Sequence, residues 1–458
     1  MLMNCFSNGK RSCNKFSIIL ILVLQASSCA TNKGAFLEID RAVGKADFSQ
    51  AIEEIRRGQE GKSAVYPAGN AISLYLDKGL LEHYAGNYRE SSNDLQFAER
   101  LIEQAYTKSI TESFFSYILN DNVKEYPGED FEDIYINVFN ALNYYKRDDL
   151  EGALVEIRKL SASSGKLDML GRKYEYTDPA TGEGLNDIVK RETGIGDFPE
   201  TKSVNFSNSA LARFLGAIFY LGAGNTDSAR IEFEQVHRAF NTNKNIYPHP
   251  VPSSVNAARN VPAGKARLNI ISFAGLSPLK QESNFPMILP FRHPVFQIAN
   301  FKIPVLSRRP SIITKIEVVI DGANRFNLEL LEDMNAVIEE TFNARYSNIL
   351  IKTFIRTILK YVASDIAVMQ TVRQQGELAG LLAAVAVRTA LELSESADTR
   401  MSRYLPGRAF IGGINLDPGT YSVIINYYNG ANIFAREEHK DIIVKSSGLN
   451  LLRSVNLN

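Results

Sequence analysis

The chain has 458 residues, with 51 Lys and Arg against 51 Asp and Glu, five histidines and no tryptophan. This charge balance lacks the basic excess of nucleic-acid-binding proteins and excludes a nucleic-acid partner. All three cysteines lie before residue 30. The rest of the chain must fold without disulfides, and it is long enough for two or three domains with cores of their own.

Residues 1–28 read as a bacterial lipoprotein signal peptide. Three basic residues precede an apolar run over 16–24, and small residues then lead to Cys29. The segment resembles the lipobox of bacterial lipoproteins, although Ala26 stands where that motif usually has leucine. The resemblance implies cleavage before Cys29 and attachment of diacylglycerol and palmitate there. The alternative is an ordinary signal peptide followed by an incidental cysteine.

The membrane connection predicted for the mature chain is an anchor and not a span. No segment has the roughly 18 consecutive apolar residues that a spanning helix needs. Two or more acyl chains at Cys29 would hold the protein firmly. We expect an exported protein, anchored by lipid to the cell membrane or the outer membrane, with its mature part in the periplasm or on the cell surface.

Four segments between residues 39 and 236 share one spacing of small and apolar residues, with gaps of nine, three, four and three. The sets are Ile39, Phe48, Ala51, Ile55 and Gly58; Gly79, Tyr88, Ser91, Leu95 and Ala98; Ala141, Leu150, Ala153, Ile157 and Leu160; and Ala217, Thr226, Ala229, Phe233 and Val236. The long gap crosses turn residues, and the short gaps place the others on one helix face. The pattern resembles the tetratricopeptide repeat and predicts a helical repeat domain over 29–240, with insertions near 107–133 and 165–205. An unrelated bundle of amphipathic helical hairpins is the alternative.

The first insertion is rich in carboxylates, which could serve as calcium ligands. It contains Asn120, Asp121 and Tyr126, then Pro127-Gly128 and an acidic run that starts at Glu129. The alternating acidic spacing of a calcium loop is missing. We therefore expect the Pro-Gly turn to begin a helix whose first turn carries these acidic residues, and we predict no metal site.

The segment 241–264 carries four prolines among Asn and Ser and predicts a linker. Beyond it, alternating apolar runs and the turn chemistry of Asp417-Pro418-Gly419 and Asn429-Gly430 predict a β-sandwich-like domain over 265–458. Expected strands cover residues 267–273, 312–320, 409–411, 416–427, 442–444 and 449–455. Two or three helices are expected to interrupt this domain at about 328–395. The predicted fold class is therefore a multidomain α+β protein, with a tetratricopeptide-like helical array followed by this β domain.

A basic stripe lies on the middle helix of this insertion. Lys352, Arg356 and Lys360 are four residues apart and share one helix face. We expect them to form the solvated face of a packed helix, and contact with anionic lipid is the alternative.

The whole chain resembles an uncharacterised family of bacterial lipoproteins that combine tetratricopeptide-like repeats with a carboxy-terminal β domain. The residues that carry this resemblance are 77–79, 84–88, 108–110, 120–122, 126, 128–132, 153–158, 275–282, 397–400 and 405–406. The family often has tryptophan where Met401-Ser402 stands. The resemblance implies architecture and anchoring, an association with envelope or cell-wall assembly, and no activity.

The sequence contains no recognisable catalytic motif. The five histidines have no metal-ligand spacing, and the nucleophile elbow, the phosphate loop and the dinucleotide fingerprint are all missing. Because Cys29 is assigned to lipid, it cannot act as a nucleophile. We predict no catalytic residues, no metal and no cofactor.

The predicted function is a non-enzymatic scaffold that is anchored to the membrane and binds other envelope proteins through its helical repeats. The candidate partner-binding residues are Asn120, Asp121, Tyr126, Glu129, Glu156 and Arg158. The alternative is a protein that binds or cleaves cell-wall glycan. It would use Glu129 and Glu156 as a carboxylate pair, or the aromatic residues Tyr421, Tyr427, Tyr428 and Phe434.

Overall fold

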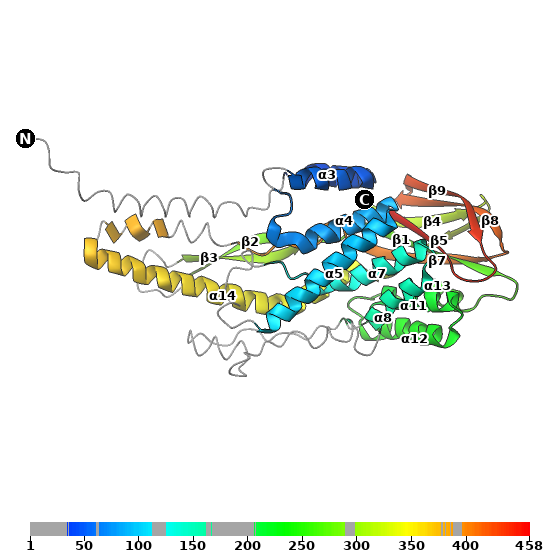
Figure 1. Cartoon of the computed structure of the whole chain (residues 1–458), viewed down its shortest axis with the longest axis horizontal. Coiled ribbons are helices and arrows are strands. Elements are labelled where there is room, and N and C mark those ends of the chain that lie inside the picture. Colours follow the sequence, from blue (N-terminus) through cyan, green and yellow to red (C-terminus); the bar gives the residue numbers. More distant parts are fainter. Residues whose placement is uncertain are drawn as a thin grey trace, which may run out of the picture.

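The computed structural model describes residues 34, 36–60, 64–111, 125–161, 166, 206, 208–288, 298–376, 379–380, 382–384, 386–387 and 396–458. Within them the protein is a mixed α+β structure. The described elements form an elongated body, with strands at one end and the long helix α14 (Met334–Gln375) reaching away at the other (Figure 1). The predicted α+β class is therefore confirmed.

Eight helices form four consecutive antiparallel pairs at the four positions that the spacing predicts. They are α2 (Leu37–Gly44) with α3 (Phe48–Glu60), α4 (Ala71–Ala85) with α5 (Tyr88–Thr111), α7 (Asp130–Lys146) with α8 (Leu150–Ser161), and α11 (Ala210–Gly222) with α12 (Thr226–Thr242). The two helices of each pair pack against each other. The turns of the second and fourth pairs use Gly86 at φ 88° and Gly224 at φ 76°, a left-handed conformation that costs glycine little.

Small residues let the helices of a pair approach closely. A Cβ atom added at Gly79 would lie 2.8 Å from the side chain of Leu95 on the partner helix. Ala51, Ala153 and Ala229, at corresponding positions of three pairs, are completely buried. A small buried residue thus stands at one of these positions in all four pairs.

The β-half contains two four-stranded sheets. One has the order β10-β1-β7-β6 and the other β5-β4-β8-β9. Their strands are β1 (Ala266–Leu276), β4 (Lys315–Ile320), β5 (Asn324–Asn327), β6 (Glu329–Asp333), β7 (Pro406–Leu416), β8 (Gly419–Asn429), β9 (Asn432–Val444) and β10 (Asn450–Asn456). Strand β10 pairs in parallel with β1, and every other pairing is antiparallel. One hydrophobic cluster includes Leu268 and Leu452 from the first sheet and Val318, Val423 and Ile425 from the second, so the sheets share a core.

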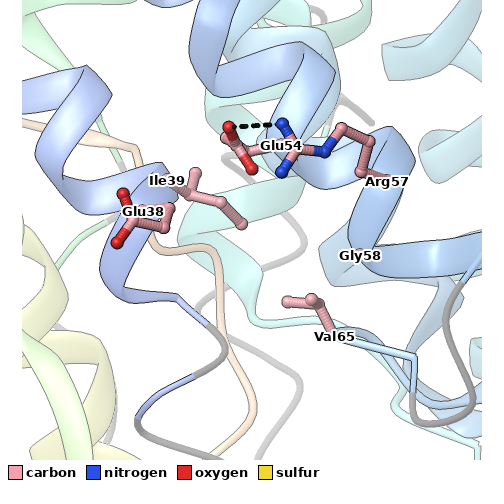
Figure 2. Close-up of a pocket in the computed structure, with 6 residues that line it drawn as sticks. All are labelled: Glu38, Ile39, Glu54, Arg57, Gly58 and Val65. Carbon is pink, nitrogen blue, oxygen red and sulfur yellow. Dashed lines mark hydrogen bonds and ion pairs between the residues drawn. The ribbon is translucent and has the colours of Figure 1, made fainter.

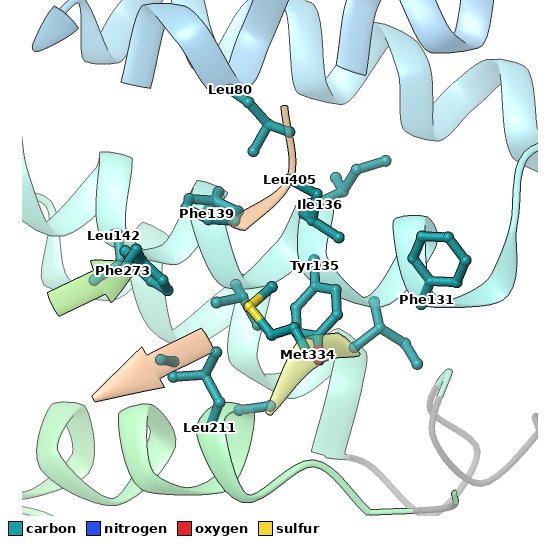
Figure 3. Packing of buried hydrophobic residues seen from close by; sticks show 14 of the residues in the cluster. Leu80, Phe131, Tyr135, Ile136, Phe139, Leu142, Leu211, Phe273, Met334 and Leu405 are labelled. Atoms are coloured by element: carbon teal, nitrogen blue, oxygen red, sulfur yellow. The ribbon is translucent and has the colours of Figure 1, made fainter. Parts of the chain in front are cut away.

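A second hydrophobic cluster joins the helices to the first sheet. It includes Leu80 of α4, Phe139 of α7, Leu211 of α11 and Phe273 of β1, which lie together in Figure 3. The rings of Phe139 and Phe273 are 5.0 Å apart between centroids. We call the side of α4, α7 and α11 that takes part in this cluster the inner face. The inner face is therefore covered by the chain's own sheet.

Two elements extend from this body. The hairpin of β2 (Leu279–Ile288) and β3 (Ile298–Ser307) forms a separate two-stranded sheet. Helix α14 (Met334–Gln375) packs along β3 and, at 1.5 Å per residue, is roughly 60 Å long. Figure 1 shows both elements pointing in the same direction away from the two larger sheets.

The structure differs from the sequence prediction in the region 328–395. Its first residues form strand β6 and not a helix; a helix of 42 residues follows, and the described residues after Gly376, at 379–380, 382–384 and 386–387, are helical as well. Arg356 on that helix is only 5% exposed, so the prediction of a solvated basic stripe is wrong at this residue. This part of α14 packs against the hairpin, where Phe354 stacks on Phe301 of β3.

The proline-containing segment 241–264 is packed and not extended in solvent. Ile246 and Tyr247 are buried, and helix α13 (Ser253–Arg259) lies against β7. The side chains of Ser253 and Ser254 donate hydrogen bonds to Glu329 of β6 at 3.0 and 2.6 Å. The division into domains at this segment stays a prediction, and the segment itself is part of the joint between helices and sheet.

Candidate functional site

The most unusual feature of the described residues is a set of buried carboxylates between the helical pairs and the β-half. Asp77, Glu132 and Glu332 are 0–1% exposed. Each accepts several hydrogen bonds, at least one of them from a group that is distant in the sequence. Buried carboxylates with shifted pKa values are common in active sites, so these three define the candidate site.

Asp77 of α4 binds the extended segment 396–405, which leads into β7. Its carboxylate accepts hydrogen bonds from the Ser402 hydroxyl at 2.8 Å, the Arg403 amide at 2.7 Å and the Tyr404 amide at 3.2 Å. The Tyr66 hydroxyl donates a fourth at 2.7 Å. Burial raises the pKa of Asp77, and these hydrogen bonds oppose the shift because they favour the charged form.

The same segment is tied to α2 and α4 by further contacts. The Arg403 guanidinium forms an ion pair with Asp40, and its Nε atom lies 2.8 Å from the carboxylate. The Tyr404 hydroxyl donates to Asp40 at 3.0 Å, while the Tyr84 hydroxyl donates to the Tyr404 carbonyl at 3.0 Å. Residues 402–404 are thus held on the first two helical pairs.

Glu132 lies in the first turn of α7. It accepts hydrogen bonds from the Tyr126 hydroxyl at 2.7 Å and the Glu129 amide at 2.8 Å, and also from the Ser402 amide. Burial, and then the negative charge of Glu129, raise the pKa of Glu132 to about 7. The bond to the Glu129 amide is part of a capping box, so the predicted acidic N-terminus of this helix is confirmed.

Glu129 is paired with two cations from the β-half. Lys280 of β2 contacts one of its carboxylate oxygens, and Arg345 of α14 lies 2.5 Å from the other. The Lys280 ammonium also donates to the Arg400 carbonyl at 3.3 Å. This cluster therefore joins the start of α7 to both extending elements and to the segment 396–405.

Glu332 of β6, like Asp77, is hydrogen-bonded to four donor groups. It accepts hydrogen bonds from the hydroxyls of Tyr135 at 2.7 Å, Ser209 at 2.9 Å and Tyr247 at 2.6 Å, and from the Leu211 amide at 3.1 Å. These partners come from α7, the start of α11 and the segment after α12. Burial raises the pKa of Glu332 while the hydrogen bonds lower it.

These carboxylates are suited to holding the fold together. A general acid or base must reach a proton on the substrate. Asp77 and Glu332 are completely buried, and their oxygens already accept hydrogen bonds from fixed donors. They lie between the helical pairs and the β-half, as the hydrophobic cluster in Figure 3 does, and they add hydrogen bonds to the apolar contacts at this junction.

The predicted partner-binding residues are not brought together on one surface. Cys29, Asn120 and Asp121 lie outside the described residues. Tyr126, Glu129 and Glu156 are buried at 2, 8 and 2% exposure, whereas Arg158 is exposed and hydrogen-bonded to Tyr220. Partner binding at these residues stays a prediction, although the three buried side chains have no free surface in this conformation.

The glycan-related residues are also separated. Glu129 contacts Lys280 and Arg345, while Glu156 accepts a hydrogen bond from Asn137 at 2.6 Å, so the two carboxylates have different surroundings.

Among the aromatic candidates, Tyr427 is completely buried in the core between the two sheets. Phe434 is 37% exposed, and the Tyr428 ring is covered by the Lys315 ammonium at 3.8 Å. The four aromatic residues therefore do not form one stacking surface.

A small hollow lies between α2 and α3. Its volume is about 260 Å³, and it is lined by Glu38, Ile39, Glu54, Arg57, Gly58 and Val65. Figure 2 shows Glu54 and Arg57 paired beside it, at a distance of 3.1 Å. The residues that the structure describes contain no cluster of three or more potential metal ligands.

Sequence reasoning missed the roles of Asp77 and Glu332. The available signal was a carboxylate next to an apolar residue: Asp77 follows Leu76 in α4, and Glu332 follows Leu331 in β6. An acidic side chain on the core side of an element must find hydrogen-bond donors. The sequence cannot say which donors those are, because they come from far along the chain.

No family model, curated protein or solved structure matches this chain. Among the described residues, none of the helices combines the length and apolar character needed to cross a membrane. The function must therefore be inferred from the residues and contacts described above.

Proposed function

We propose that the protein is an exported lipoprotein, anchored through Cys29, that acts as a non-enzymatic scaffold for other proteins of the bacterial envelope. The observation that carries this proposal is the series of four helical pairs with one internal spacing. We interpret them as tetratricopeptide-like repeats, which typically bind protein segments. We interpret the two four-stranded sheets with their shared core as a β-sandwich-like domain.

The covered inner face changes where a partner would bind. Repeat arrays usually bind ligands in their concave groove, but here the hydrophobic cluster and the carboxylates connect that side to the chain's own sheet. We therefore assign partner binding to the outer face, which we define as the exposed side of α5, α8 and α12. Phe97, Val155 and Ile231 are exposed there by 37, 46 and 48%. Val155 and Ile231 each follow the buried alanine of their repeat by two residues.

Site-specific photo-crosslinking in intact cells of the native bacterium tests this proposal. A photoreactive amino acid is placed at Val155 or Ile231, and at Ile443 of β9 as a control that is 66% exposed. We expect the two outer-face positions to yield the same small set of envelope proteins, and the control position not to yield it.

A second control is the Cys29→Ala variant, which removes the proposed anchor. We expect it to weaken the crosslinks, because an unanchored protein is diluted away from membrane partners. Crosslinks that are no more specific from the outer face than from Ile443 would contradict the proposal.

A further inference from the structure

Two cations lie where the ends of α4 and α7 approach β10: the hydroxyl of Tyr145, next to Lys146, donates to the Leu449 carbonyl at 2.9 Å and accepts from the Leu451 amide at 3.0 Å. Lys146 is the last residue of α7, and Arg453 lies on β10 with its side chain directed to the end of α4. The Arg453 Nη2 atom donates to the His83 carbonyl and to the Tyr88 hydroxyl, both at 3.2 Å. Both cations are partly exposed, so a small solute can reach them.

Neither cation has an acidic partner. Lys146 makes no hydrogen bond or ion pair in the part of the chain that the structure describes, and Arg453 bonds only neutral oxygens there. By contrast, the Lys166 ammonium lies 2.6 Å from Asp133 and 2.7 Å from Glu99. Arg309 also donates only to carbonyl oxygens, but Lys146 and Arg453 are two such cations at one junction.

The surroundings add further signs of a missing negative group. The Nε atom of Arg453 is buried and has no hydrogen-bond partner among the described residues. Burial, and then the charge of Arg453, lower the pKa of Lys146 to about 8. The pKa of His83 is lowered well below its usual value by burial and by both cations.

Neighbouring groups reduce the positive charge only in part. His83 Nδ1 lies 2.6 Å from the Asn143 side-chain oxygen, whose amide nitrogen donates to Ser91 at 2.8 Å. This arrangement makes Nδ1 the donor, while burial and the two cations, which lower the pKa of His83, favour the neutral ring. The C-terminal ends of α4 and α7 each contribute a partial negative charge of about 0.5, which does not balance two full cations.

We propose that Lys146 and Arg453 form a binding site for an oxyanion, the phosphate or carboxylate group of a ligand. An arginine presents several donors in a plane and a lysine adds a mobile point charge, a combination that suits both groups. The site lies at the junction of helices and sheet, apart from the three buried carboxylates, and it does not depend on the proposed scaffold function.

Protection of Lys146 from acetylation tests this site in the full-length protein in detergent. An N-hydroxysuccinimide ester is the reagent, and peptide mass spectrometry measures the labelling of each lysine. In about 10 mM inorganic phosphate or glutarate, with chloride at matched ionic strength as reference, we expect labelling of Lys146 to slow at least about fivefold. Lys440, an exposed lysine on β9, is expected to label at an unchanged rate.

The choice of anion distinguishes the two chemistries. Protection by phosphate alone assigns a phosphorylated ligand, and protection by glutarate alone assigns a carboxylate ligand. Equal labelling of Lys146 in phosphate, glutarate and chloride would overturn the proposal.

Two variants separate binding from folding. Lys146→Met removes a charge that makes no hydrogen bond or ion pair among the described residues and keeps an apolar stem, so we expect it to fold and to lose anion binding by isothermal titration calorimetry. Lys440→Met makes the same charge change and should bind as the wild type does. Arg453→Lys keeps the charge but not the planar donors, and we expect it to reduce protection of Lys146 at least about threefold. Wild-type affinity in Lys146→Met would refute the site even if the labelling result were positive.

Discussion

Replacing Glu332 by alanine should greatly destabilise the joint between helices and sheet. The substitution leaves four buried donors without an acceptor, namely the hydroxyls of Tyr135, Ser209 and Tyr247 and the Leu211 amide. Each unsatisfied buried donor costs about 1–3 kcal/mol, and relief of the buried charge offsets part of that sum. We expect the free energy of unfolding to fall by about 4 kcal/mol.

Urea denaturation measures this loss. Because the chain has no tryptophan, the transition is followed by far-ultraviolet circular dichroism and tyrosine fluorescence. Glu332→Gln keeps one acceptor oxygen and should lose about half as much stability. Glu438→Ala is the control, because Glu438 is 51% exposed and lies 3.8 Å from its arginine partner; it should change stability by less than about 0.5 kcal/mol. A loss below about 1 kcal/mol in Glu332→Ala would refute the assignment of this carboxylate as the shared acceptor.

Three further predictions concern pH, close packing and the segment 396–405. The pKa of Glu132 is about 7 in the folded protein, so the folded state keeps a proton that the unfolded state loses as the pH rises from about 4.5 to 7. The free energy of unfolding should therefore fall by up to about 3 kcal/mol over that range. Urea denaturation at several pH values measures this fall, which should be smaller in Glu132→Gln. Gly79→Ala should lower the free energy of unfolding by about 1–3 kcal/mol, and with it the melting temperature, because the new Cβ would lie 2.8 Å from the Leu95 side chain. Gly44→Ala is the control and should not lower the melting temperature, because no atom lies closer than 4.0 Å to its new Cβ. Arg403→Met should speed hydrogen exchange in α2, because it removes the partly exposed ion pair with Asp40; unchanged exchange there would show that the pair does not hold α2.

The sequence predicts the helical pairs well because their signal is local. The spacing of Gly79, Tyr88, Ser91 and Leu95 reflects contacts within one pair of adjacent helices, so a short stretch of sequence contains it. The turn at Gly86 follows from the same stretch, since a positive φ favours glycine. The strands next to tight turns, such as β8 after Asp417-Pro418-Gly419, are equally local and are found for the same reason.

The joint between helices and sheet could not be predicted in this way. The Ser402 hydroxyl and Asp77 are 325 residues apart in sequence, and Tyr135 and Glu332 are 197 apart. Such pairs depend on how complete elements pack. Strand β6 illustrates the same limit, because the apolar and acidic residues of 329–333 fit a helix as well as a strand and only pairing with β7 decides between them.

The covered inner face is the central claim of this account, since it is the reason for placing the proposed partner site on the outer face. Hydrogen–deuterium exchange of the free protein tests it most directly. We expect the amides of α7 and β1 to exchange with the same high free energy of opening, because Phe139 and Phe273 belong to one core. If α7 exchanged rapidly while β1 stayed protected, the inner face would open in solution. That result would contradict the account and return the partner site to the groove of the repeats.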